Sequence, residues 1–285
     1  MIDEYRRNVL AIAEAIAPGW ERRRAFIEET TAPVREWLVD ALAPKAGETV
    51  LELAAGAGDV GFAAAARTGE TGRLITTDVS PTMLDVARRR GSELELENVD
   101  YRVMDAEQVE LEDDSVDGIL CRFGYMLLPD PQAALAEAKR VLRPGGRLAL
   151  AVWGPPERNP FFSLIGLALV RHGHLPPPDP RQPGIFALAD PNRLRALLEG
   201  AGFTDIRLTD VSVVFAVEGI DEYLAILSDT AGPLGLALRD VDDDERVTIA
   251  DELRDAFLQA GRALCGCQSS GGGVRPGPAR SRDGG

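Results

Sequence analysis

Histidine and cysteine are scarce in this sequence, and their scarcity excludes several kinds of site. Among 285 residues there are two histidines, His172 and His174, and three cysteines, Cys121, Cys265 and Cys267. Three cysteines at these positions do not make a disulfide framework, and Cys-x-Cys with two histidines is a poor zinc site. We therefore expect no metal ion and a reducing, cytoplasmic setting.

Basic residues and long apolar runs are also under-represented. Lys and Arg total 31 against 46 Asp and Glu, a net charge of −15. This argues against nucleic acid as the main partner, because phosphate binding requires clustered Lys and Arg. The longest apolar-rich stretch, residues 161–170, is too short to cross a bilayer, and the charged first ten residues do not resemble a signal peptide. Hydrophobic residues still make up 45% of the chain, enough for a sizeable core.

The most informative stretch is a glycine-rich turn between an apolar strand and an alanine-rich helix. Gly56, Gly58 and Gly61 form G-x-G-x-x-G after the strand expected at 49–53. Glycines allow a tight turn whose main-chain N–H groups contact a ligand, and the following helix directs its positive end to the same place. We interpret Gly61 as serving helix packing. The pattern predicts a nucleotide-type binding site.

Strand and helix patterns alternate on both sides of this turn. They predict an α/β, Rossmann-like, doubly wound and mainly parallel sheet of six to seven strands with helices on both faces. Ligands of such sheets bind beyond the carboxyl ends of the strands. The expected strands are 49–53, 73–78, 99–104, 115–121 and 147–153, and the expected helices are 59–67, 81–91 and 131–142.

The segments around this core read as helical additions. The sequence of residues 1–44 predicts two helices separated by Pro18-Gly19, and Pro33 is expected to kink or divide the second helix. This segment is expected to form either a packing layer or a lid with Trp20 facing the site. Within the core, 45–217, an apolar insertion at 154–189 covers the pocket mouth, and a helix at 190–200 precedes a strand from 203 to about 217. Two helical stretches form a cap at 218–264, and residues 265–285 are expected to be a disordered tail.

Two acidic residues suggest different ligands. Asp78 stands 20 residues after Gly58, the spacing at which an acid meets the ribose of a dinucleotide, so an NAD site is open on these features. Glu52, at the end of the first strand, favours another ligand, because a buried carboxylate requires a cationic partner and would repel a pyrophosphate. The ammonium of an amino-acid ligand is such a partner.

The segments that follow two of the predicted strands would suit adenosine. Asp78 is followed by Val79, the helix cap Ser80 and Met83, where ribose and adenine would fit, although Met83 is equally well explained as helix core. After the third strand, Asp105 is placed to accept a hydrogen from the adenine amino group.

These motifs together resemble the class I S-adenosylmethionine-dependent methyltransferases, in particular the ubiquinone/menaquinone-biosynthesis group. The resemblance covers about residues 20–217 and rests on Glu-x-x-x-Gly-x-Gly at 52–58, Asp78-x-Ser-Pro-x-Met-Leu, Asp105-Ala-Glu, Arg122-Phe-Gly and Leu-Arg-Pro-Gly-Gly. It implies roles for eleven residues in cofactor binding. Glu52, Ala54, Gly56 and Gly58 would hold the methionine part, Asp78 the ribose, Val79 and Met83 the adenine faces, Asp105 and Ala106 the adenine edge, and Arg122 and Phe123 the floor near the sulfonium.

The C-terminus departs from the family pattern. Such folds end in a seventh, antiparallel strand, whereas residues 265–285 show no strand pattern. Either residues 211–217 complete the sheet or the sheet lacks that strand.

The resulting hypothesis is an enzyme that transfers a methyl group from S-adenosylmethionine, leaving S-adenosylhomocysteine, to the oxygen or carbon of a small, apolar organic acceptor. The alternatives are an NAD(P)-dependent oxidoreductase and a non-catalytic S-adenosylmethionine-binding protein. No catalytic residue is assigned: His172, His174 and Tyr125 are weak candidates for a general base. A homodimer is compatible with the sequence.

Overall fold

Seven strands form one sheet in a computed structural model, which describes residues 2–179, 181–260 and 263–276. The strand order is β3-β2-β1-β4-β5-β7-β6. The strands are β1 (Thr49–Glu52), β2 (Arg73–Asp78), β3 (Val99–Val103), β4 (Val116–Arg122), β5 (Leu142–Trp153), β6 (Phe203–Ala216) and β7 (Ala263–Pro276). Strands β1 to β5 pair in parallel, and β7 is antiparallel to both β5 and β6. The predicted fold class and all five predicted core strands are confirmed.

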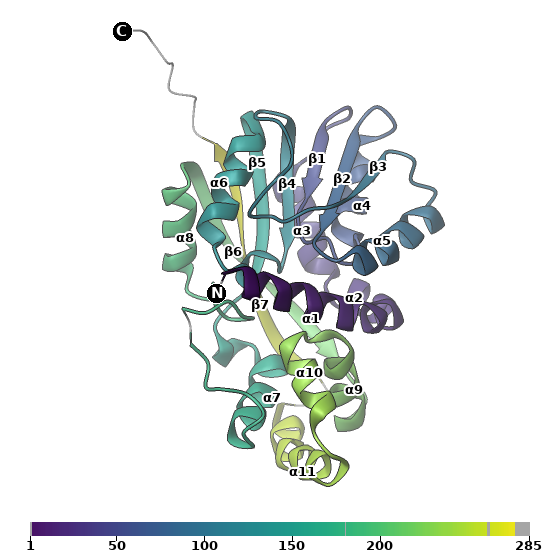
Figure 1. Cartoon of the computed structure of the whole chain (residues 1–285), viewed down its shortest axis with the longest axis vertical. Helices are drawn as coiled ribbons and strands as arrows, with labels where there is room; N and C mark the ends of the chain where they lie inside the picture. The colour runs from purple at the N-terminus through teal and green to yellow at the C-terminus, as the bar shows by residue number, and fades with distance from the viewer. Residues whose placement is uncertain (1, 180, 261–262, 277–285) are drawn as a thin grey trace.

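Helices cover the sheet and form a separate layer beside its edge (Figure 1). The helices of the core are α3 (Ala32–Leu42), α4 (Asp59–Thr68), α5 (Pro81–Glu93), α6 (Pro131–Val141) and α8 (Pro191–Gly200). The others are α1 (Ile2–Arg22), α2 (Arg24–Thr30), α7 (Pro160–Arg171), α9 (Ile220–Thr230), α10 (Pro233–Asp240) and α11 (Asp243–Ala260), with 3-10 turns η1 (Tyr125–Leu127) and η2 (Pro156–Arg158). Helices α7, α9, α10 and α11 gather below the sheet in Figure 1, and α1 lies between this group and the strands.

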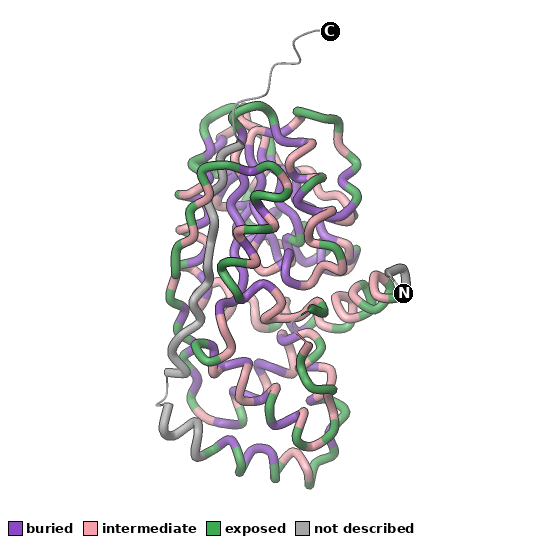
Figure 2. The backbone as a smooth tube through the Cα atoms, turned by 90° about the vertical axis from the view of Figure 1, so that its left-hand side faces the viewer, coloured by how far each residue is buried: buried purple, intermediate pink, exposed green. Residues whose placement is uncertain are grey.

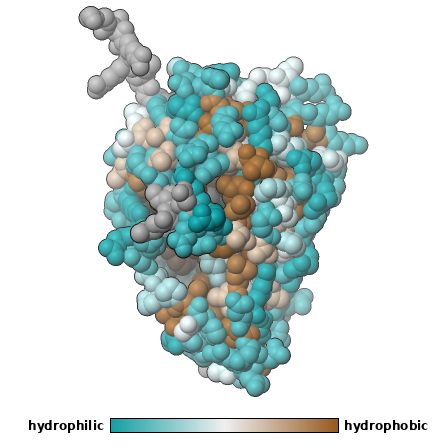
Figure 3. Space-filling view, in the orientation of Figure 1, coloured by the Kyte–Doolittle hydropathy of each residue, from teal (hydrophilic) through white to brown (hydrophobic). Residues whose placement is uncertain are grey.

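The core is built from apolar strands whose two faces are both covered. All of the residues Leu148–Trp153 of β5 are buried, as a strand between helix layers requires. Polar residues dominate the face of the molecule drawn in Figure 3, around a central band of hydrophobic ones. Among the described helices, none has the length and apolar character needed to span a membrane.

Three element predictions are wrong. Helix α1 continues through Pro18 instead of breaking there, and Gly19 brings it so close to α9 that an added Cβ would lie 2.1 Å from the Asp229 carbonyl oxygen. Residues 218–260 hold three helices rather than two. Residues 263–276 form β7, the antiparallel strand between β5 and the edge strand β6, so the sheet does not lack this strand and residues 211–217 do not replace it. The last part of the predicted tail, 277–285, lies outside the described residues. Pro33 falls in the first turn of α3, and the helix is divided at Thr31 as expected.

Candidate cofactor site

The predicted site residues come from the carboxyl ends of four neighbouring strands. The loops after β3, β2, β1 and β4 lie side by side because these strands are consecutive in the sheet. They carry Asp105 and Ala106, Asp78 and Val79, Ala54 to Gly58, and Arg122 and Phe123 respectively. Parallel sheets bind ligands at this edge.

The glycine turn requires glycine at two positions. Gly56 has φ +57° and Gly58 has φ +83°, both in the left-handed region that a Cβ disfavours. A Cβ on Gly58 would also lie 2.5 Å from the Phe62 ring. Ala54 adopts a left-handed φ of +51° without being glycine, so this position is strained. The Trp20 ring of α1 lies over Gly56, which places Trp20 at the site.

Asp78 connects the glycine turn to the start of α5. Its Oδ2 accepts a hydrogen bond from the Gly56 N–H at 3.0 Å and its Oδ1 one from the Ser80 N–H at 3.0 Å. Burial raises the pKa of this carboxyl group. A carboxylate can accept about four hydrogen bonds, and the Val79 N–H is a third backbone donor to this one, so one acceptor position remains for a ribose hydroxyl group. The observed geometry fits the role expected of Asp78.

Glu52 points into the protein interior. Its Oε1 accepts from the Gly61 N–H and its Oε2 from the Thr76 hydroxyl, both at 2.7 Å, and only 2% of the residue is exposed. Burial raises the pKa of Glu52 to about 7. The partners that the buried carboxylate needs are therefore donors of the protein itself, and the geometry does not support the hypothesis that Glu52 meets a ligand's ammonium group.

Gly61 serves helix packing, as interpreted from the sequence, and its N–H also donates to Glu52. A Cβ at this position would lie 2.2 Å from Glu52 Oε2, so α4 can approach β1 only with glycine here. The glycine pattern and the acidic residue thus belong to one structural unit, in which Glu52 fixes the first turn of α4 behind the glycine turn.

Arg122 is also turned away from the expected cofactor floor. Its guanidinium makes two hydrogen bonds to Asp59, at 2.6 and 2.9 Å, and one to the Thr31 hydroxyl at 2.5 Å. Both side chains of the ion pair are almost fully buried. The pair joins the end of β4 to the start of α4, and Asp59, which the sequence did not single out, is the residue that holds Arg122.

The remaining predicted residues divide between the site edge and the core. Met83 and Ala106 are buried, Val79 and Asp105 are half-buried, and the Asp105 Oδ1 accepts from the Glu107 N–H at 2.9 Å. Met83 therefore behaves as helix core, the second of its two explanations.

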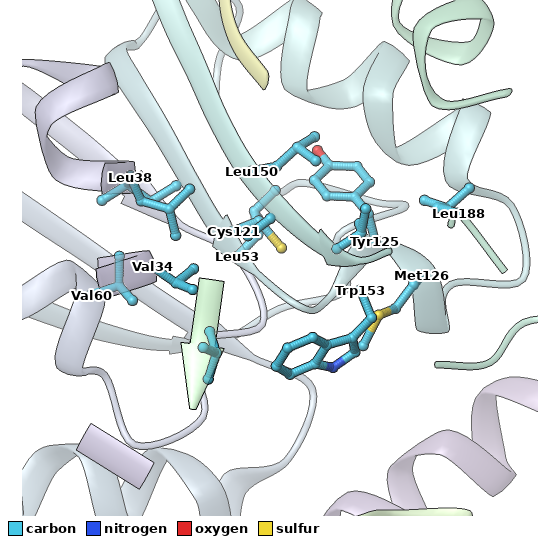
Figure 4. Packing of buried hydrophobic residues seen from close by; sticks show 14 of the residues in the cluster. Val34, Leu38, Leu53, Val60, Cys121, Tyr125, Met126, Leu150, Trp153 and Leu188 are labelled. Atoms are coloured by element: carbon cyan, nitrogen blue, oxygen red, sulfur yellow. The ribbon is translucent and has the colours of Figure 1, made fainter. Parts of the chain in front are cut away.

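None of the weak candidates for a general base lies in a suitable environment. The Tyr125 hydroxyl is buried without a hydrogen-bond partner, its pKa is raised well above 10 by burial, and it points away from Trp153 (Figure 4). His172 and His174 contact Glu245 of α11, far along the chain from the strand ends. Within the described residues, no group of three or more His, Cys, Asp or Glu is arranged to hold a metal ion.

Comparison with known proteins identifies the class of enzyme to which the chain belongs. The model of the ubiE/COQ5 methyltransferase family matches residues 31–161, which include every strand end described above. The chain is a class I S-adenosylmethionine-dependent methyltransferase. S-adenosylmethionine is the methyl donor of this class and S-adenosylhomocysteine its product. The glycine turn, Asp78 and Asp105 lie at the strand ends where the sequence predicts this cofactor.

Two curated relatives show how far the likeness of this methyltransferase extends. An arsenite methyltransferase of Halobacterium salinarum is 31% identical over 59% of this chain, which spans 40% of that protein. The ubiquinone/menaquinone biosynthesis C-methyltransferase UbiE of Escherichia fergusonii is 29% identical over 60% of this chain and 72% of its own length. Their different acceptors leave the acceptor of this methyltransferase undetermined.

A solved structure supports the fold alone. The geranyl diphosphate C-methyltransferase of Streptomyces coelicolor superimposes with a TM-score of 0.52 at 16% identity, covering 86% of this chain and 79% of that one.

Proposed function

We propose that this methyltransferase transfers the methyl group of S-adenosylmethionine to a small, apolar organic acceptor, at an oxygen or carbon atom. We infer the acceptor class from a cluster of aromatic rings that begins at the glycine turn. Gly124 packs so closely on the turn that a Cβ added to it would lie 2.6 Å from the Ala54 Cβ. The neighbouring Phe123 is the first ring of the cluster.

The rings form a continuous cluster from β4 across to β6, which we call the aromatic wall, and all of them except Phe123 are buried. Phe123 stacks on Trp153 with ring centroids 4.0 Å apart and an interplanar angle of 11°. Trp153 in turn lies 5.1 Å from Phe162 and 6.1 Å from Phe215, and Phe161 stacks on Phe215 at 3.8 Å. Arg122 precedes this wall in sequence, but its charge is neutralised by Asp59. Such a wall favours an uncharged, apolar molecule.

The bound cofactor supplies an electrophilic methyl group, so the contribution of the protein is to position the acceptor and exclude water. Asp78 orients the adenosine, the main-chain groups of the glycine turn orient the methionine part, and the aromatic wall holds the acceptor beside Ala54. Positioning of this kind can contribute roughly 7–11 kcal/mol to lowering a barrier. We assign no general base.

Titration with S-adenosylhomocysteine in a calorimeter tests the cofactor part of the proposal. We expect binding by the wild-type protein and about tenfold to hundredfold weaker binding by Asp78→Asn, because a charged acceptor of the ribose hydroxyls is lost. Asp85→Asn on the exposed face of α5 is the matched control and should bind like wild type. Binding of NADH in place of S-adenosylhomocysteine would refute the proposal.

Transfer from radiolabelled S-adenosylmethionine tests the acceptor class. We expect methylation within a panel of apolar phenols and prenylated rings, and loss of transfer when the same molecules carry a carboxylate. Trp153→Leu should raise the KM for the acceptor without weakening S-adenosylhomocysteine binding. Equal rates for charged and uncharged members of each pair would contradict the proposed acceptor class.

A further inference from the structure

Helix α1 contacts the adenine side of the site through a charged side chain. Arg6 Nε lies 3.2 Å from the Asp105 Oδ2, and Arg6 Nη2 lies 2.5 Å from the Glu107 Oε2. The Glu107 side chain is 1% exposed, so this ion pair is partly protected from solvent. The other oxygen of Asp105 already accepts from the Glu107 N–H. One carboxylate oxygen of Asp105 therefore accepts a hydrogen bond, and the other is paired with the charge of the Arg6 guanidinium.

A second polar contact from α1 lies beside Asp78. The Glu14 carboxylate accepts hydrogen bonds from the Ser80 hydroxyl at 2.5 Å, from the Thr82 N–H at 3.2 Å and from the Thr82 hydroxyl. The Ser80 hydroxyl bond is the main cause that lowers the pKa of Glu14. Glu14 and Arg6 thus attach α1 to the two strand ends that would hold adenosine.

The two halves of α1 are attached in different ways. Residues 4–16 include no buried residue, and Figure 2 shows this half projecting from the side of the molecule. The other half is packed: Ala17 and Gly19 are buried, and the Trp20 indole N–H donates to the Thr230 carbonyl oxygen at 3.1 Å. The half that carries Arg6 is therefore less buried than the other half, and local opening is easier where less apolar surface is buried.

We propose that Arg6 and the adenine amino group of the cofactor compete for Asp105, so that the N-terminal half of α1 is a latch which the cofactor must release. This inference rests on the proposed role of Asp105 in reading adenine. Only the molecules in which Arg6 has released Asp105 can bind the cofactor through Asp105. The apparent affinity for cofactor is therefore lowered in proportion to the fraction of molecules in this released state. Removing Arg6 should then strengthen cofactor binding, although it removes a contact at the site.

Calorimetric titration of S-adenosylhomocysteine into Arg6→Ala and Arg7→Ala provides the test. Arg7 is an exposed neighbour of the same charge, so Arg7→Ala is the matched control. We expect Arg6→Ala to bind about threefold to thirtyfold more tightly than wild type and Arg7→Ala to bind like wild type. Raising the salt concentration should strengthen binding by wild type, because it screens the ion pair, and should leave Arg6→Ala unchanged.

Hydrogen exchange distinguishes a latch that opens from a lid that closes. If the cofactor displaces Arg6, saturating S-adenosylhomocysteine should speed amide exchange in residues 5–16 of wild type, and Arg6→Ala should exchange quickly with or without it. Slower exchange on binding, or weaker binding by Arg6→Ala, would overturn the latch while leaving the proposed function intact. Failure of both wild type and Arg6→Ala to bind S-adenosylhomocysteine would overturn the proposed function and the latch with it.

Discussion

The contact between Gly61 and Glu52 shows how one missing side chain can determine the geometry of a site. Glycine inside a helix usually lowers stability relative to alanine by about 1 kcal/mol. At Gly61 the sign should be reversed, because a Cβ would lie 2.2 Å from a carboxylate oxygen that Thr76 and the Gly61 N–H hold in place. We expect Gly61→Ala to lower the free energy of unfolding by about 1–3 kcal/mol, as overpacking of a core does, measured by urea unfolding.

Gly166, in the middle of α7, is the matched control. A Cβ there would lie 3.7 Å from the nearest atom, an ordinary contact with Leu234. Gly166→Ala should therefore stabilise the protein by about 0.5–1 kcal/mol. If both substitutions change the unfolding midpoint in the same direction, the proposed link between Gly61 and Glu52 is wrong.

Ala54 offers a second test at the residue scale. Its φ of +51° is left-handed, which costs a residue with a Cβ about 1–2 kcal/mol, whereas glycine adopts it freely. After allowing about 0.5–1 kcal/mol for the greater freedom of glycine in the unfolded chain, we expect Ala54→Gly to raise the free energy of unfolding by about 0.5–1 kcal/mol. Ala57→Gly, in the same turn but without a left-handed φ, should lower it. A loss of stability in Ala54→Gly equal to that in Ala57→Gly would contradict the argument.

Sequence patterns place residues at strand ends but do not fix the directions of their side chains. The spacing of Asp78, Asp105 and the glycines is enough to predict that they lie at one edge of the sheet, because parallel strands end at one edge. Glu52 and Arg122 were assigned to the ligand, yet each is turned to a partner on α4, Gly61 or Asp59. Those partners become visible only when α4 is packed on the sheet, so periodicity could not identify them.

At the scale of elements, α7 and α11 are joined by a cluster of ionisable groups. His172 lies 3.1 Å from both Glu245 and Glu252, His174 lies 3.0 Å from Glu245, and Arg171 also pairs with Glu252. The hydrogen bond to Glu252, then that to Glu245, raises the pKa of His172 above its usual value of 6.5. A raised histidine pKa means that the folded state favours the proton.

The contact between α7 and α11 should therefore weaken as the pH rises. The contribution of His172 is fully present below about pH 6.5 and is lost as the pH passes through the raised pKa of the folded state. Once intrinsic rates are corrected for, we expect hydrogen exchange in residues 245–253 to become faster as the pH rises above about 6.5. His172→Gln should show fast exchange throughout, and Asp85→Asn should behave like wild type. Exchange that stays constant with pH in the wild-type protein would contradict this role for His172.

Proline and glycine patterns predicted some helix ends well and others poorly. Pro33 does lie in the first turn of a new helix, and Ser80 caps α5 by accepting from the Met83 N–H at 2.9 Å. Pro18 does not end α1, because the close approach of Gly19 to α9 and the hydrogen bond of Trp20 hold the helix together beyond it. Tertiary contacts of this kind override the preference of proline for ending a helix, and the residues near Pro18 in the sequence do not reveal them.

At the scale of the whole molecule, the largest departure from the sequence prediction is β7. Its segment is rich in Gly and Ser and has no alternation of apolar and polar residues, so composition favoured a disordered tail. The structure pairs it on both sides, with Gly272 opposite Leu150 of β5 and Leu208 of β6. Backbone hydrogen bonds hold a strand in place whatever its side chains, which is why an apolar pattern was not required here.

Strand β7 lies between the parallel core and the edge strand β6 and connects the two. This role can be tested by a substitution that removes one backbone hydrogen-bond donor from β7. Proline at position 272 would lack the N–H and would disrupt a strand that is central to the sheet. We expect Gly272→Pro to lower the free energy of unfolding by about 3 kcal/mol or more, or to split urea unfolding into two transitions as β6 separates from β5. Gly272→Ala keeps the N–H and should have a smaller effect. Wild-type unfolding in Gly272→Pro would show that β7 is not part of the sheet in solution.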